Sequence, residues 1–167
     1  MRVALATLVP LAAALLQGSL VPFIAVAGAR PNLVVLVAAS WAVAAGAREA
    51  VWWAFLGGLA ADLLSGGPLG ALALAALVPV AAVGVGDIQR RPRSVPSAAL
   101  LVGGASLVAG VLYILILGLA GVTTGELPLL LATAISGALY NGVLALALYP
   151  LFRTLRRTTE KQASFGW

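Results

Sequence analysis

Residues able to carry acid–base or nucleophilic chemistry are few and far apart in this chain of 167 residues. It has no histidine and no cysteine, which removes the commonest general base, the thiolate nucleophile and the usual nitrogen and sulfur metal ligands. The only lysine, Lys161, lies near the end of the chain. The carboxylates are equally scattered: Glu49, Asp62, Asp87, Glu126 and Glu160. We therefore predict no enzyme activity, no cofactor and no metal site.

Asp62 stands out because it lies inside an apolar stretch, GGLAADLLSGGPLG. On a helix its neighbours lie three or four positions away, so its face is built from small residues. Small residues let membrane helices approach closely, and Asp62 is therefore expected to face protein rather than lipid. We refer to this face as the Asp62 stripe: Ala54, Gly58, Ala61, Asp62 and Ser65.

Three roles are open for Asp62. The favoured one is structural: the carboxylate pairs with Arg30, or it accepts backbone N–H groups at the start of the next helix, where negative charge is stabilised. The alternatives are contact with a second membrane protein and a proton or ion path. In each case we expect Gly66 to help end the helix that carries Asp62 and Pro68 to start the following one.

The composition predicts the elements that position these residues. Hydrophobic residues make up 62% of the chain and charged residues 9%, whereas soluble domains carry about 25% charged residues. We predict an all-α integral membrane protein with one domain. Spanning helices need about 20 apolar residues, and the charges and Gly/Pro clusters divide the chain into six such segments. These are 3–24, 31–47, 49–65, 68–86, 97–121 and 127–152, followed by a basic tail over 153–167.

The basic residues predict the orientation. With both termini inside, nine of the ten lie on the cytoplasmic side and only Arg30 lies outside, as the positive-inside rule requires. The net charge of +5 therefore reflects topology and predicts no nucleic-acid partner. The cytoplasmic arginines fit anionic lipids or, alternatively, an acidic protein: Arg90, Arg91, Arg93, Arg153, Arg156 and Arg157.

The first segment also admits a second interpretation. MRVALATLVPLAAALL followed by AVAGA is similar to a secretory signal peptide with a small-residue cleavage site. The apolar run is longer than a signal peptide requires, so a retained first helix is favoured.

Polar and aromatic residues within the segments are expected to hold helices together or to mark the membrane surface. Tyr140 and Asn141 are the best candidates for hydrogen bonds between helices. Four aromatic residues near the cytoplasmic ends are predicted to form an interfacial belt: Trp52, Trp53, Tyr149 and Phe152.

Two stretches resemble a known family. RPNLVVLVAASWAVAAGAREAVWWAFLGGLAADLLSGGPLGALALAAL (30–77) is similar to the signature region of the bacterial rod shape-determining protein MreD, and YNGVLALALYPLFRTLRR (140–157) resembles its last span. Asn32 stands where many members have Asp, which leaves a charge-based role at this position unsupported. The motif positions are Pro31, Asn32, Gly58, Asp62, Leu63, Ser65, Gly66, Pro68 and Gly70.

The resemblance implies a function and a fold. MreD proteins are non-enzymatic components of the elongation machinery in the bacterial inner membrane. They partner MreC, and through it MreB, RodA and a class B penicillin-binding protein, and a homo-oligomer is possible. The family's fold is similar to the substrate-binding subunits of energy-coupling-factor transporters. On this basis we predict a membrane scaffold in which small-residue helix faces form a groove for partner helices, and the Asp62 stripe is one candidate surface.

A second function remains open. A vitamin-type substrate-binding subunit of a transporter has the same size and number of spans. A pocket for such a ligand needs several convergent polar groups. Few outward residues qualify: Arg30, Asp62, Thr123, Thr124 and Glu126.

Overall fold

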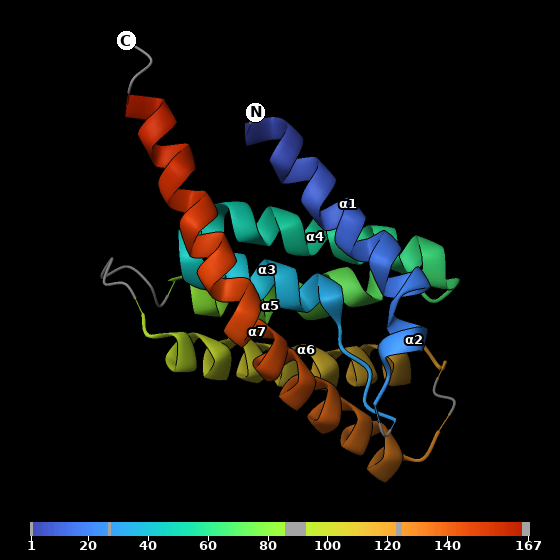
Figure 1. The fold of residues 1–167 in the computed structure, drawn as a ribbon. Coiled ribbons are helices and arrows are strands. Elements are labelled where there is room, and N and C mark those ends of the chain that lie inside the picture. Colours follow the sequence, from blue (N-terminus) through green and yellow to red (C-terminus); the bar gives the residue numbers. More distant parts are fainter. Residues whose placement is uncertain (1, 27, 86–92, 123–124, 165–167) are drawn as a thin grey trace.

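The computed structural model describes residues 2–26, 28–85, 93–122 and 125–164, and the regular elements within these ranges are all helices. One isolated bridge, between Val26 and Ala29, is the only strand-like pairing among them. The helices are α1 (Arg2–Ser19), α2 (Val21–Ile24), α3 (Leu33–Ala45), α4 (Ala47–Ser65), α5 (Ala71–Val85), α6 (Val95–Leu119) and α7 (Leu127–Ser164). Figure 1 shows α3 to α6 running roughly alongside one another, with α1 and α7 crossing them diagonally.

Two details differ from the segments that the sequence predicts. The first segment is interrupted at Leu20, because Pro22 lacks the N–H that would bond the carbonyl of Gly18. The last helix does not end at residue 152 but continues to Ser164, so the described part of the predicted tail is helical.

Membrane crossing is supported most directly for α6 and α7. Among the described residues, Val95–Leu119 and Leu127–Arg156 are long and apolar enough to span a bilayer. Three further apolar helices are shorter: Ala4–Ser19, Leu33–Ala45 and Ala71–Val85. A helix of 13 residues is about 20 Å long, less than a hydrocarbon core of about 30 Å. Six spans therefore stay a prediction.

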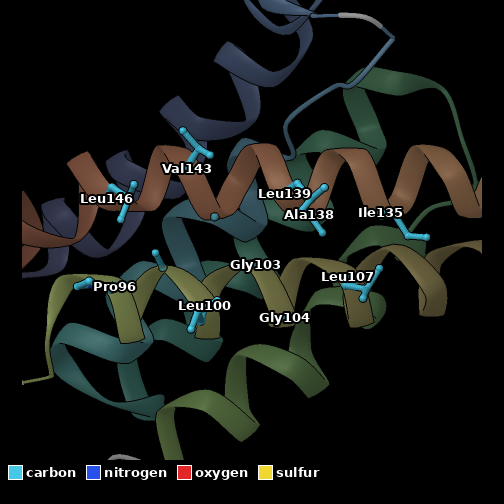
Figure 2. Close-up of a pocket in the computed structure, with 12 residues that line it drawn as sticks. Pro96, Leu100, Gly103, Gly104, Leu107, Ile135, Ala138, Leu139, Val143 and Leu146 are labelled. Atoms are coloured by element: carbon cyan, nitrogen blue, oxygen red, sulfur yellow. The ribbon is translucent and has the colours of Figure 1, made fainter.

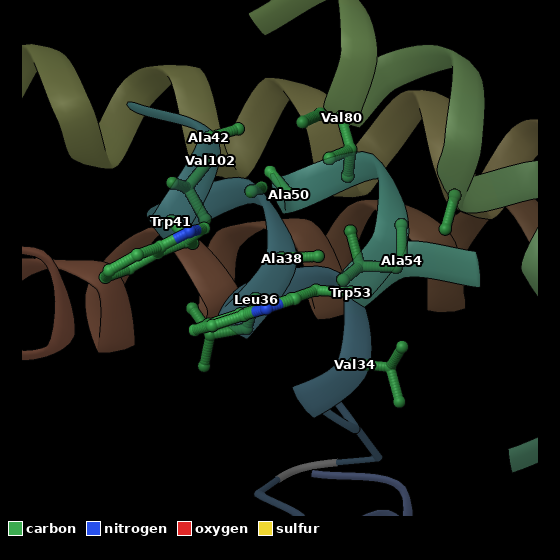
Figure 3. Packing of buried hydrophobic residues seen from close by; sticks show 14 of the residues in the cluster. Val34, Leu36, Ala38, Trp41, Ala42, Ala50, Trp53, Ala54, Val80 and Val102 are labelled. Carbon is green, nitrogen blue, oxygen red and sulfur yellow. The ribbon is translucent and has the colours of Figure 1, made fainter. Parts of the chain in front are cut away.

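Helix α3 forms the centre of the bundle. Ten of its 13 residues are buried, because it is apolar on every face and packs against α1, α4, α5, α6 and α7. Its Trp41 stacks on Trp53 of α4 with ring centroids 4.7 Å apart, and Phe152 of α7 meets Trp41 edge-on at 5.6 Å. Figure 3 shows the two indoles within this buried cluster.

This aromatic cluster corrects the predicted interfacial belt. Trp53, Tyr149 and Phe152 are buried against other helices, whereas Trp52 is 48% exposed. The sequence places the four side chains near one end of the bundle, but only the packing decides which of them face outward.

Helices α4 and α5 form a close antiparallel pair. A Cβ on Gly58 would lie 2.5 Å from Cα of Ala73, and a Cβ on Gly84 would lie 2.5 Å from Cα of Ala47. The two contact points lie 11 residues apart on α4 (Ala47 and Gly58) and 11 residues apart on α5 (Ala73 and Gly84). The two backbones therefore keep one register between these points. Gly66, at φ 68°, ends α4 in the left-handed conformation that glycine adopts readily.

Candidate functional site

Asp62 caps the N-terminus of α5. The backbone N–H of Leu72 donates to both carboxylate oxygens, at 3.0 and 3.2 Å, and the N–H of Ala73 donates to Oδ2 at 3.4 Å. The side chain is 2% exposed. Since the first amides of a helix have no intrahelical acceptor and carry positive dipole charge, the carboxylate fills a structural need. Of the arrangements expected for Asp62, the structure shows the one in which the carboxylate accepts backbone N–H groups at the start of the next helix.

The expected ion pair between Asp62 and Arg30 is absent from the described residues. Arg30 is exposed, and its backbone carbonyl lies against α7, 2.8 Å from the position of a Cβ on Gly137. Pro68 also differs from its predicted place: α5 begins at Ala71, so Pro68 precedes the helix and its carbonyl accepts the N–H of Ala71 at 3.2 Å. Gly70, the residue before α5, has φ 90°, a conformation that glycine adopts readily and other residues resist.

The Asp62 stripe is closed within the chain. Ala54, Gly58, Ala61 and Asp62 are buried, and α5 contacts Gly58 so closely that a methyl group has no room there. Only Ser65 is exposed, and its hydroxyl donates to the carbonyl of Asp62 at 3.1 Å. The prediction that partner helices bind along this stripe is therefore wrong, because α5 of the same chain already occupies it.

A second group of polar residues holds the start of α3. The Asn32 side chain accepts the N–H of Val35 at 3.1 Å, an N-cap for which Asn and Asp serve equally well. Gln17 of α1 binds the same region twice: its Oε1 accepts the N–H of Leu33 at 2.6 Å and its Nε2 donates to the carbonyl of Pro31 at 3.3 Å. The sequence places Gln17 among the polar residues within apolar segments that are expected to hold helices together, and these two bonds agree with that expectation.

Asn141 and Tyr140 connect α7 to its neighbours. Asn141 is fully buried, and its Nδ2 donates to the carbonyl of Asn32 at 3.0 Å and to Oγ of Ser106 at 2.9 Å. The Tyr140 hydroxyl donates to the carbonyl of Ile24 at 2.8 Å. These contacts use the polar groups of α7 for helix packing.

The opposite end of the bundle collects arginines. Arg156 donates to the carbonyl of Ala44, where the C-terminal end of α3 favours a cation. Arg48 is exposed and Arg153 is half-buried. Arg90, Arg91 and the side chain of Arg157 lie outside the described residues.

No group of three or more acidic residues comes together in the described part of the chain to bind a metal ion. Asp62 serves α5, and Glu49 accepts the indole N–H of Trp41 at 3.2 Å. The polar side chains that bond across the bundle therefore serve helix packing.

A groove lies on the outer surface between α6 and α7 (Figure 2). Its volume is about 550 Å³, and every residue lining it is apolar or glycine. The floor is made of small residues, because the two helices cross closely: a Cβ on Gly103 would lie 3.3 Å from the carbonyl oxygen of Ala138. The rim carries exposed large side chains, among them Leu100 at 78% and Leu139 at 68%.

Gly104 is an unexplained glycine in this groove. It lies inside α6, and a Cβ built there would meet nothing within 4 Å. A mid-helix glycine costs about 0.5–1 kcal/mol relative to alanine, and no contact within the described residues offsets that cost. The sequence carries the signal in its glycines at 103, 104, 110 and 142, but it cannot show which of them pack internally and which stay open.

These features define the class of protein: an all-helical membrane protein whose polar side chains are used mainly for helix packing. Residues 1–159 match the model of the family described as rod shape-determining protein MreD. The chain belongs to this family, which has its role in rod-shape determination. No curated protein and no solved structure matches it.

Proposed function

We propose that this protein is a non-enzymatic, multi-pass scaffold of the bacterial inner membrane that binds the spanning helix of MreC. Through MreC it would reach MreB, RodA and a class B penicillin-binding protein. The six-span arrangement with both termini inside, and a fold similar to energy-coupling-factor substrate-binding subunits, are part of this proposal. The family match and the distribution of basic residues support it.

The observation that carries the proposal is the groove between α6 and α7. Packing of helices in membranes depends on close van der Waals contact over small residues, since lipid removes the hydrophobic driving force. The groove floor offers such residues, and a Cβ built on Gly104 meets no described atom within 4 Å.

The size of the groove indicates how a helix would bind. Its lining runs from Pro96 to Leu107 on α6, which is about 16 Å at 1.5 Å per residue. A volume of about 550 Å³ over that length corresponds to a cross-section of about 30 Å². A helix is about 10–12 Å across with its side chains, so it would lie on the groove and insert its large side chains.

The test is Gly104→Leu, which fills the groove, with Gly18→Leu as the matched control. Gly18 also lies within a helix and also has nothing within 4 Å of a built Cβ, but it is on α1, outside the groove. We expect Gly104→Leu to lose co-purification of tagged MreC from native membranes and to fail to restore rod shape in a deletion strain. Gly18→Leu should behave as wild type.

Equal recovery of MreC with Gly104→Leu and wild-type protein would refute the assignment of this groove. Thermal unfolding of both variants in detergent separates lost binding from lost folding, because a Cβ at either position meets no described atom within 4 Å.

A further inference from the structure

The groove between α6 and α7 ends in positive charge at one side. Pro96, the first lining residue on α6, is three positions after Arg93. Leu146, the last lining residue on α7, is seven positions before Arg153. Seven residues make nearly two helical turns, so Arg153 lies on the same face of α7 as Leu146.

Arg93 precedes α6 and Arg153 lies on α7, and a hydrogen bond joins these two sides of the groove at this end. The Tyr149 hydroxyl of α7 donates to the carbonyl oxygen of Arg93 at 3.3 Å, and Tyr149 is itself 2% exposed. Arg153 follows Tyr149 by one helical turn, so it lies next to the segment that carries Arg93. Arg153 is half-buried. Its spacing from Leu146 puts it beyond that end of the groove, about 10 Å further along α7 at 1.5 Å per residue.

This combination fits an amphiphile. The groove has no polar lining side chain, and its cross-section of about 30 Å² is too narrow to enclose a helix about 10–12 Å across. An extended hydrocarbon chain fits such a channel. The guanidinium at the mouth favours a phosphate, since arginine matches phosphate oxygens in a two-bond geometry.

We propose that the groove binds one anionic phospholipid, with an acyl chain along the floor near Gly103 and Gly142 and the phosphate beside Arg153. The inference rests on the proposed function only in using the same groove, so a partner helix would compete with the lipid. Lipid binding itself is a property of the protein without its partner.

The experiment is native mass spectrometry of the purified full chain, titrated with phosphatidylglycerol and, separately, with phosphatidylcholine of the same chains. We expect one phosphatidylglycerol to bind at lower concentration than phosphatidylcholine. Arg153→Gln should weaken phosphatidylglycerol binding about fivefold, the factor that corresponds to one basic residue near a charged membrane surface. Binding of phosphatidylcholine should not change.

Two control variants locate the site. Arg48→Gln removes an arginine from the first turn of α4, which does not line the groove, and should leave binding unchanged. Gly104→Leu fills the groove and should abolish binding of both lipids. Equal binding of the two lipids by wild type, equal losses with Arg153→Gln and Arg48→Gln, or full binding by Gly104→Leu would each overturn the proposal.

The outcomes separate the two proposals. If lipid binds as described and MreC still fails to bind, only the proposed function is wrong. If MreC binding requires an open Gly104 position while the lipids show no preference, only the lipid inference is wrong.

Discussion

Replacing Gly58 with alanine should destabilise the protein, although alanine is the better helix former. The new methyl carbon would lie 2.5 Å from Cα and 2.7 Å from N of Ala73. Carbon atoms pack best at about 3.5–4.0 Å, so the α5 backbone must move by about 1 Å. That movement also pulls Leu72 and Ala73 away from the carboxylate of Asp62.

The magnitude follows from two opposing terms. Overpacking of a closely packed contact costs about 1–3 kcal/mol, and a backbone neighbour places Gly58→Ala at the upper end. The gain from replacing a helical glycine is about 0.5–1 kcal/mol. We expect a net loss of about 2 kcal/mol, which lowers Tm by about 4–8 °C for a chain of this size.

Gly104→Ala is the matched control. It makes the same chemical change inside a helix but meets nothing within 4 Å, so only the helix-propensity term remains. We expect it to raise Tm by about 1–4 °C. Gly84→Ala should repeat the loss seen with Gly58→Ala, because its methyl carbon would lie 2.5 Å from Cα of Ala47.

The assay is thermal unfolding in mild detergent, followed by tryptophan fluorescence. The stacked pair of Trp41 and Trp53 lies in the buried core and will report loss of packing. A Tm for Gly58→Ala at or above that of wild type would refute the close α4–α5 approach. The same would follow if Gly58→Ala and Gly104→Ala shifted Tm in the same direction.

Two further predictions concern the polar contacts. Asp62→Ala leaves two buried amides without an acceptor and should lower the free energy of unfolding by about 2–3 kcal/mol. Asp62→Asn keeps one acceptor oxygen and should lower it by about half as much. Unfolding by SDS in mixed micelles measures both losses, and wild-type stability of Asp62→Ala would exclude the cap. Tyr140→Phe removes one hydrogen bond between segments and should cost about 0.6 kcal/mol, the average for such bonds in membranes. Asn141→Ala removes two and should cost about twice that in the same assay; equal losses for the two variants would contradict this additive view.

Much of the helical architecture could be predicted from the sequence. Apolar segments separated by charges and by Gly/Pro clusters lie close to the helices of the structure, because segment length and the cost of leaving backbone groups unbonded in lipid leave few alternatives. The role of Asp62 as a cap could be named among the alternatives, since a turn as short as that around Gly66 brings its helix next to the following amides.

The candidate surface could not be predicted in the same way. The Asp62 stripe and the floor of the α6–α7 groove are both made of small residues, and both have the spacing of a helix–helix contact. A Cβ on Gly58 would clash with α5, whereas a Cβ on Gly104 would meet no described atom within 4 Å.

The sequence by itself therefore determined the class of protein, its helices and the local chemistry of its turns. Only the tertiary structure decided which small-residue face is filled internally and which stays open. The physical reason is that helix formation depends on near neighbours in the chain, whereas occupancy of a face depends on how helices far apart in the sequence cross one another.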